Sequence, residues 1–172
     1  MEVPGTTRTG VETAESRGAV WGRRGVLAVL AAFALLGLSG FLGVHTATAE
    51  ADQDGFHVSV RYASFARSGL DVPWQVTVHQ DGGLGETVTL AVTADYFDIY
   101  ETQGFSPDPA SSVRNGDTLF LTFDSPGGDT FVVSYDAYIQ PASQQGRDGT
   151  VGVVTSDGRT VASVDFRTRL LP

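Results

Sequence analysis

The sequence predicts an all-β domain of seven strands, arranged as a sandwich and preceded by one transmembrane helix. The first observation is a block of twenty residues without a charge, residues 25–44. The second is a period of two in the apolar residues of seven short segments after residue 56, which is typical of strands with one buried face. The third is that the 172 residues include no cysteine, which excludes disulfides and thiolate metal sites.

The N-terminal part predicts a tail and a spanning helix. Residues 1–24 are polar without a periodic apolar face, and we expect them to form a disordered cytoplasmic tail. Residues 25–44 would span about 30 Å as a helix, which is the thickness of the hydrocarbon core of a bilayer. Arg23 and Arg24 precede this block, and no basic residue follows it until Arg61. Because cytoplasmic flanks are rich in basic residues, the N-terminus is predicted inside and the C-terminal domain outside the cell membrane.

A cleaved signal peptide is the alternative interpretation of the same block. Residues 47–49, Ala-Thr-Ala, form an A-x-A site, and cleavage after Ala49 would release a secreted domain. The apolar block is longer than the about 7–15 residues of a typical secretory signal, and its length favours the anchor. Residues 45–56 are then expected to be a linker that holds a domain of residues 57–172 close to the membrane surface.

Seven segments of this domain alternate apolar and polar side chains, so that each has one face to bury. They are HVSVRY (57–62), PWQVTVHQ (73–80), ETVTLAVTA (86–94), TLFLTF (118–123), TFVVSYDAYIQ (130–140), TVGVVT (150–155) and TVASVDFRTRL (160–170). Turn residues separate them, and Asp157-Gly158 supplies the positive φ angles of a tight hairpin. This number of strands is typical of an immunoglobulin-like β-sandwich, in which Trp74 would be the large buried side chain.

Two longer segments resemble a known family. WQVTVHQDGGLGETVTLAV and TLFLTFDSPGGDTFVVSYDAYIQP resemble the immunoglobulin-like repeat domains of bacterial surface proteins, where a W-x-V-x-V strand, a turn and a V-x-L-x-V strand follow one another. The whole chain is similar to single-pass membrane proteins of high-GC bacteria that carry one such domain outside. The resemblance covers residues 56–172 and implies a fold without catalytic residues. Unlike those repeats, the domain stands alone and has Asp81-Gly82-Gly83 where they often have Asn-Gly.

The segment of residues 95–117 is longer than most connections in a compact domain. Four aromatic residues in it are the candidate binding residues: Tyr96, Phe97, Tyr100 and Phe105. Two interpretations stay open. These side chains close one end of the sandwich as part of its core, or they remain on the surface as a contact patch for a partner.

The net charge and the polar residues limit the functions that the domain can have. Residues 50–172 hold seven arginines and seventeen acidic residues, a net charge of −10, so we expect no binding of nucleic acid. His45, His57 and His79 lack the spacing of metal ligands, and neither a G-x-S-x-G motif nor a cysteine nucleophile is present. We expect no catalytic residues, no metal and no cofactor.

The predicted function is therefore that of a membrane-anchored, extracytoplasmic binding or accessory module. Its expected partner, besides the membrane itself, is another membrane or cell-envelope protein. A secreted binding domain is the first alternative, and a hydrolase or metal-dependent enzyme with residues assembled only by the fold is the second.

Overall fold

The computed structural model describes residues 17–40, 43–101 and 104–171. The chain divides between Gly43 and Val44 into an N-terminal unit with one helix and a β-domain. Of the predicted cytoplasmic tail, residues 1–16 lie outside the described residues.

Helix α1 spans Arg17–Leu38 and is long and apolar enough to cross a bilayer, a property that membrane anchors and signal sequences share. It begins at Arg17 rather than at residue 25. Arginine is a good helix former, so Arg23 and Arg24 bound the uncharged block but do not end the helix. It ends before Gly40, whose φ of 69° is the left-handed conformation common just after helices.

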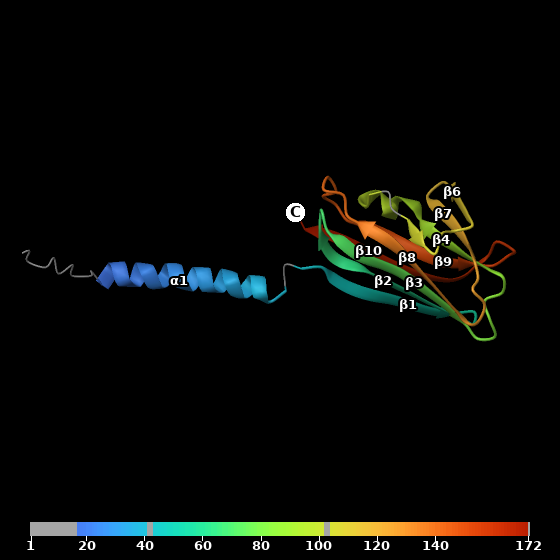
Figure 1. The fold of residues 1–172 in the computed structure, drawn as a ribbon, viewed down its shortest axis with the longest axis horizontal. Helices are drawn as coiled ribbons and strands as arrows, with labels where there is room; N and C mark the ends of the chain where they lie inside the picture. Colours follow the sequence, from blue (N-terminus) through green and yellow to red (C-terminus); the bar gives the residue numbers. More distant parts are fainter. Residues whose placement is uncertain (1–16, 41–42, 102–103, 172) are drawn as a thin grey trace, which may run out of the picture. The chain divides into compact units, whose positions relative to one another are not determined.

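The β-domain has ten strands in the part of the chain that the structure describes, compared with the seven predicted (Figure 1). They are β1 (His45–Gln53), β2 (Phe56–Arg67), β3 (Asp71–Gln80), β4 (Thr87–Thr93), β5 (Phe105–Ser106), β6 (Ser111–Asn115), β7 (Thr118–Asp124), β8 (Thr130–Tyr138), β9 (Arg147–Val154) and β10 (Thr160–Leu171). The additional strands are β1, β5 and β6. A short 3-10 helix, η1 (Ala94–Ile99), follows β4.

The strands form one curled sheet in the order β5-β8-β3-β2-β10-β9-β4-β7-β6, and β1 pairs with β2. Strand β10 joins the two halves, because residues 160–168 pair antiparallel with β9 and residues 169–171 pair parallel with β2. The curl brings β7 and β8 together across the core, where the ring centroids of Phe123 and Phe131 are 5.2 Å apart. Trp74 is 1% exposed, which confirms that it belongs to the core.

Residues 45–53 form strand β1 and not the predicted linker. They pair antiparallel with β2, from His45 opposite Phe65 to Gln53 opposite Phe56. Their inward side chains are Ala47, Ala49 and Ala51, which are half-buried and alternate with exposed polar residues. Alanine gives only a weak apolar signal, which explains why the period of two is hard to recognise here. The two alanines of the A-x-A sequence, Ala47 and Ala49, thus lie on the inner face of a strand.

The two ends of the β-domain differ. At one end β1 begins, β10 ends and η1 lies, since His45 and Arg169 both pair with Phe65 (Figure 1). We call this the closed end. At the opposite end, four turns connect the strands, and we call it the loop end. These turns are residues 54–55, 81–86, 125–129 and 155–159.

Candidate functional site

The four predicted binding residues, Tyr96, Phe97, Tyr100 and Phe105, form a cluster of packed aromatic side chains at the closed end, which we call the plug. Tyr96 is fully buried and Tyr100 is 2% exposed, whereas Phe97 and Phe105 are half-buried and pack against the core. The rings of Phe97 and Phe105 have centroids 5.6 Å apart, and both pack edge to face against Trp74. The burial corresponds to the core interpretation, and neither tyrosine is accessible to a partner.

Hydrogen bonds between hydroxyl groups connect the plug to strand β10. The Tyr96 hydroxyl lies 2.8 Å from Thr168 Oγ1 and 2.9 Å from the Tyr100 hydroxyl, and Thr168 is fully buried. Burial, which disfavours the charged phenolate, raises the pKa of Tyr96 well above its usual value and also raises the pKa of Tyr100. Both side chains are therefore neutral at the pH at which an exposed tyrosine begins to ionise.

These tyrosines make the fold sensitive to alkaline pH. Because their folded-state pKa values lie above the unfolded value of about 10, the stabilisation is complete below that pH and is lost as the pH rises towards the folded values. We expect the free energy of unfolding, measured with urea at pH 9, 10 and 11, to fall above pH 10 by up to about 1.4 kcal/mol per pH unit for each tyrosine. Tyr96→Phe should reduce this slope. Equal slopes in Tyr96→Phe and the parent chain would contradict the assignment.

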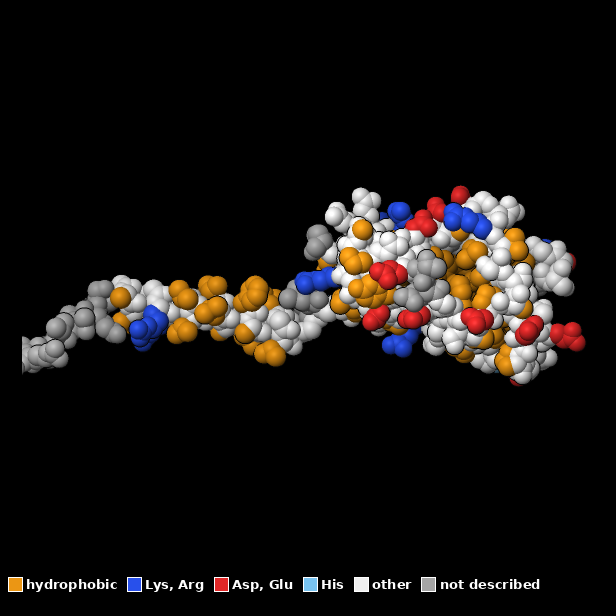
Figure 2. Space-filling model, turned by 45° about the horizontal axis from the view of Figure 1, so that its top comes forward, with side chains coloured by type: hydrophobic (Ala, Val, Ile, Leu, Met, Phe, Trp, Pro, Cys, Tyr) orange, Lys and Arg blue, Asp and Glu red, His pale blue; other side chains and the backbone are white. Residues whose placement is uncertain are grey.

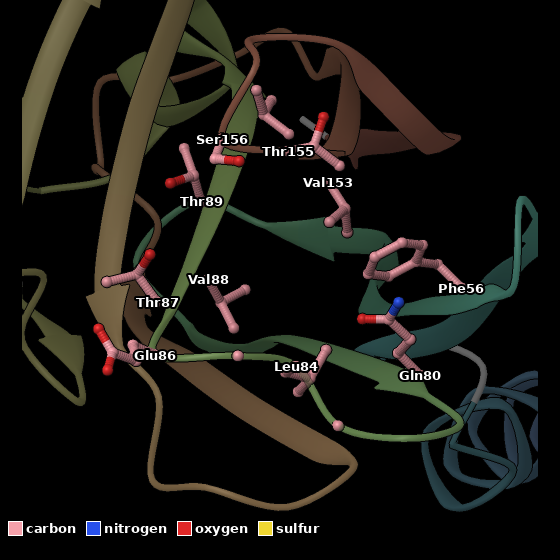
Figure 3. Close-up of a pocket in the computed structure, with 13 residues that line it drawn as sticks. Phe56, Gln80, Leu84, Glu86, Thr87, Val88, Thr89, Val153, Thr155 and Ser156 are labelled. Carbon is pink, nitrogen blue, oxygen red and sulfur yellow. The ribbon is translucent and has the colours of Figure 1, made fainter.

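The loop end contains a groove, whereas the aromatic plug fills the closed end. A groove of about 430 Å³ lies here between the two halves of the sheet, within the range of about 300–1,000 Å³ usual for ligand pockets. Its floor consists of Leu84, Val88 and Val153, which are between 3% and 9% exposed. Phe56 and Gln80, opposite each other at the ends of β2 and β3, form one wall, as Figure 3 shows.

The groove exists because β9 ends at Val154, opposite Thr89, and so does not reach the beginning of its antiparallel neighbour β4. Strand β4 pairs with β7 along its whole length, but its pairing with β9 extends only to Thr89, opposite Val154. After Val154 the chain turns into the hairpin of residues 155–159, in which the Gly158 N–H donates to the Thr155 carbonyl. The β9-facing side of Thr87 and Val88 is consequently left without a strand neighbour among the described residues.

Two glycine-rich turns hold the opposite rim of the groove. The Gln80 N–H donates to the Asp129 carbonyl at 2.9 Å, and the Leu84 N–H donates to the Gly128 carbonyl at 3.1 Å. Gly83 and Gly128 have φ angles of 101° and 90°, which only glycine adopts readily. These bonds hold Leu84 on the floor of the groove.

The charged side chains at the loop end are acidic with one exception. Residues 52–57, 79–89, 124–130 and 153–160 contain seven acidic residues and one arginine, a net charge of −6 with neutral histidines. The acidic residues are Asp52, Asp54, Asp81, Glu86, Asp124, Asp129 and Asp157. Arg159 is itself paired with Asp157 at 2.6 Å, and hydrogen bonds from Thr155 and Arg159 lower the pKa of Asp157. Figure 2 shows acidic side chains along the lower right of the β-domain. This end attracts cations and repels anions.

Two histidines lie in a second, shallow depression of about 390 Å³ that shares Phe56 with the groove. His57 Nδ1 lies 2.7 Å from Asp52, and His79 lies 2.9 Å from the Thr130 hydroxyl and 3.3 Å from Asp81. Each histidine therefore contacts one carboxylate. Among the residues that the structure describes, no group of three or more His, Asp and Glu side chains could hold a metal ion.

The groove residues carry no sequence motif of their own. Phe56, Gln80, Val88 and Val153 belong to predicted strands or their borders. The glycine-rich turn of residues 82–85 and the predicted hairpin at Asp157-Gly158 mark the neighbourhood only as loops. No model of a known protein family matches the chain, and no curated protein matches it either.

Proposed function

We propose that this chain is a membrane-anchored binding module without catalytic activity, with an extracytoplasmic, immunoglobulin-like β-sandwich whose loop end is the contact surface. The observation that carries the proposal is the groove. It opens at the end of the β-domain opposite to the start of β1, whereas the closed end is plugged by aromatic side chains. The groove thus lies at the end of the β-domain that has no chain connection to α1.

Anchoring by α1 is supported by the strand that follows it. Only residues 39–44 separate α1 from β1, and β1 contributes half-buried alanines to the β-domain. Cleavage after Ala49 would remove five of the nine residues of β1, including Ala47 and Ala49 on its inner face. Retention of α1 keeps this strand whole, and a secreted domain that begins at Glu50 would expose part of the edge of β2.

The fold proposal rests on the curled sheet, whose two halves enclose Trp74 in a common core, and on the resemblance to bacterial surface repeats. The orientation proposal rests on Arg23 and Arg24 at the N-terminal side of the apolar block. With the β-domain outside the cytoplasm, the partner would be another membrane or cell-envelope protein.

Fractionation of bacteria that produce the full chain with a C-terminal tag tests this proposal. We expect the tag in the membrane fraction, an N-terminal mass that includes α1, and loss of the tag when protease is added to intact protoplasts. A cytoplasmic marker protein should survive the protease and serves as the control for intact cells. A mature N-terminus at Glu50 in the medium would mean a secreted domain, and a tag protected in protoplasts would mean the opposite orientation.

A further inference from the structure

We infer that the groove at the loop end binds an extended segment of a partner protein in which apolar and basic side chains alternate. This inference rests on the proposed function of the loop end as a contact surface. It adds the chemistry of the occupant, and three features of the groove support it.

The floor of the groove selects apolar side chains. Leu84, Val88 and Val153 offer only carbon atoms from their side chains, and the ring of Phe56 lies beside them (Figure 3). The Gln80 amide adds one neutral polar group to this wall. A volume of about 430 Å³ is enough for two or three side chains of the size of valine or leucine.

The backbone of β4 favours an extended chain as the occupant. Thr87 and Val88 pair with β7 on one side but have no partner strand on the side that faces the groove, because the ladder with β9 stops at Thr89. A peptide that lies along this stretch would continue the sheet and form main-chain hydrogen bonds. Since side chains alternate along a strand, every second one would point to the floor.

The acidic charge near the groove favours basic side chains at the positions of the peptide that do not point to the floor. Glu86 lines the groove and precedes Thr87 in the chain, and Asp124 is the partner of Thr87 on β7, one strand away from the unpaired edge of β4. Both carboxylates are exposed. Neither forms an ion pair among the salt bridges of the described residues. Lysine or arginine side chains at alternate positions of the peptide would reach them, whereas an anionic ligand would be repelled by the loop end.

The test uses the full chain in nanodiscs of phosphatidylcholine, whose headgroup has no net charge. The probe is the fluorescein-labelled peptide Lys-Val-Lys-Val-Lys-Val-Lys, and its anisotropy reports binding. The matched control peptide has serine in place of each valine and the same charge. We expect the valine peptide to bind at least tenfold more tightly than the serine peptide at 50 mM NaCl, and to lose about tenfold in affinity at 300 mM NaCl.

Variants in which two carboxylates are replaced by amides test whether the peptide binds at the groove. Glu86→Gln combined with Asp124→Asn should weaken binding of the valine peptide about tenfold. The control is Glu101→Gln combined with Asp136→Asn, which removes the same charge from exposed positions away from the loop end and should change the affinity less than twofold. All four side chains are exposed, so the variants should fold, and circular dichroism checks this. Equal weakening by both pairs would mean attraction to the overall charge only and would overturn the inference.

A fluorophore at the groove shows whether the peptide or a neutral sugar binds there. The chain has no cysteine, so an environment-sensitive dye on Ser156→Cys reports from the rim alone. Its emission should shift with the valine peptide and stay unchanged with the neutral sugar chitotriose. A shift with chitotriose, equal binding of both peptides, or no binding of the valine peptide at 1 mM would each overturn the inference. The fractionation experiment is independent of these outcomes. A chain that is anchored as proposed but does not bind the peptide would refute the inference about the ligand of the groove and leave the proposed membrane anchoring intact.

Discussion

Replacement of Tyr96 by Ala is expected to lower the free energy of unfolding by about 3–5 kcal/mol, the usual cost of removing a large buried aromatic side chain. Its ring packs against Phe97, Tyr100 and Phe166 with centroid distances of 4.8–5.6 Å, and the cavity would lie inside the plug of the closed end. The change would also remove a hydrogen-bond partner from the buried Thr168 hydroxyl, which adds to the cost. Urea denaturation measures the effect.

A substitution on the surface provides the comparison. Val113 on the edge strand β6 is 56% exposed, and Val113→Ala should change the free energy of unfolding by less than about 0.5 kcal/mol. If Tyr96→Ala were as mild as Val113→Ala and yet abolished crosslinking to a membrane partner, the residue would be a contact residue and the plug would be misassigned.

Replacement of Gly146 by Ala is expected to prevent stable folding, or to cost more than about 4 kcal/mol. A Cβ atom at this position would overlap the carbonyl oxygen of Thr168 and would lie 2.7 Å from its carbonyl carbon. These atoms belong to the backbone of β10, where Thr168 pairs with Arg147, so they cannot move aside without breaking that pair. Soluble yield and the midpoint of thermal unfolding measure the result.

Gly104 is the matched control for this substitution. A Cβ at Gly104 would meet nothing within 4 Å, and its φ does not lie in the left-handed region. Gly104→Ala should therefore leave the midpoint within a few degrees of the parent chain. A Gly146→Ala chain with the parent midpoint would place residues 144–146 farther from β10 than the structure does.

The predicted strands correspond to strands of the structure because their signal is local. Alternation such as Val58, Val60 and Tyr62 needs only one face to bury, and every predicted segment has it. The three additional strands lack this signal for different reasons. The inward residues of β1 are alanines, β5 has two residues, and all five residues of β6 are exposed.

The candidate functional site depends on contacts between residues that are far apart in the sequence. The aromatic residues of 95–106 indicate burial by their composition, but the partner that fixes Tyr96 is Thr168, seventy-two positions away. The groove arises because β9 stops short of the beginning of β4, and the sequence of either strand alone does not show how far its neighbour extends. Gly149 illustrates the same point: a Cβ there would lie 2.7 Å from the ring of Phe166 and 2.9 Å from that of Tyr96. Its need for glycine follows only from the packed structure.

The direction of β1 decides how the domain resists a mechanical load. The strand runs from His45 at the closed end to Gln53 at the loop end, antiparallel to β2. A partner held at the loop end would pull along this strand while α1 holds its beginning, so the ladder between β1 and β2 would be sheared rather than peeled apart. In shear, the inter-strand hydrogen bonds share the force at the same time instead of breaking one after another. A tether at the start of β1 would therefore load the ladder between β1 and β2 in shear.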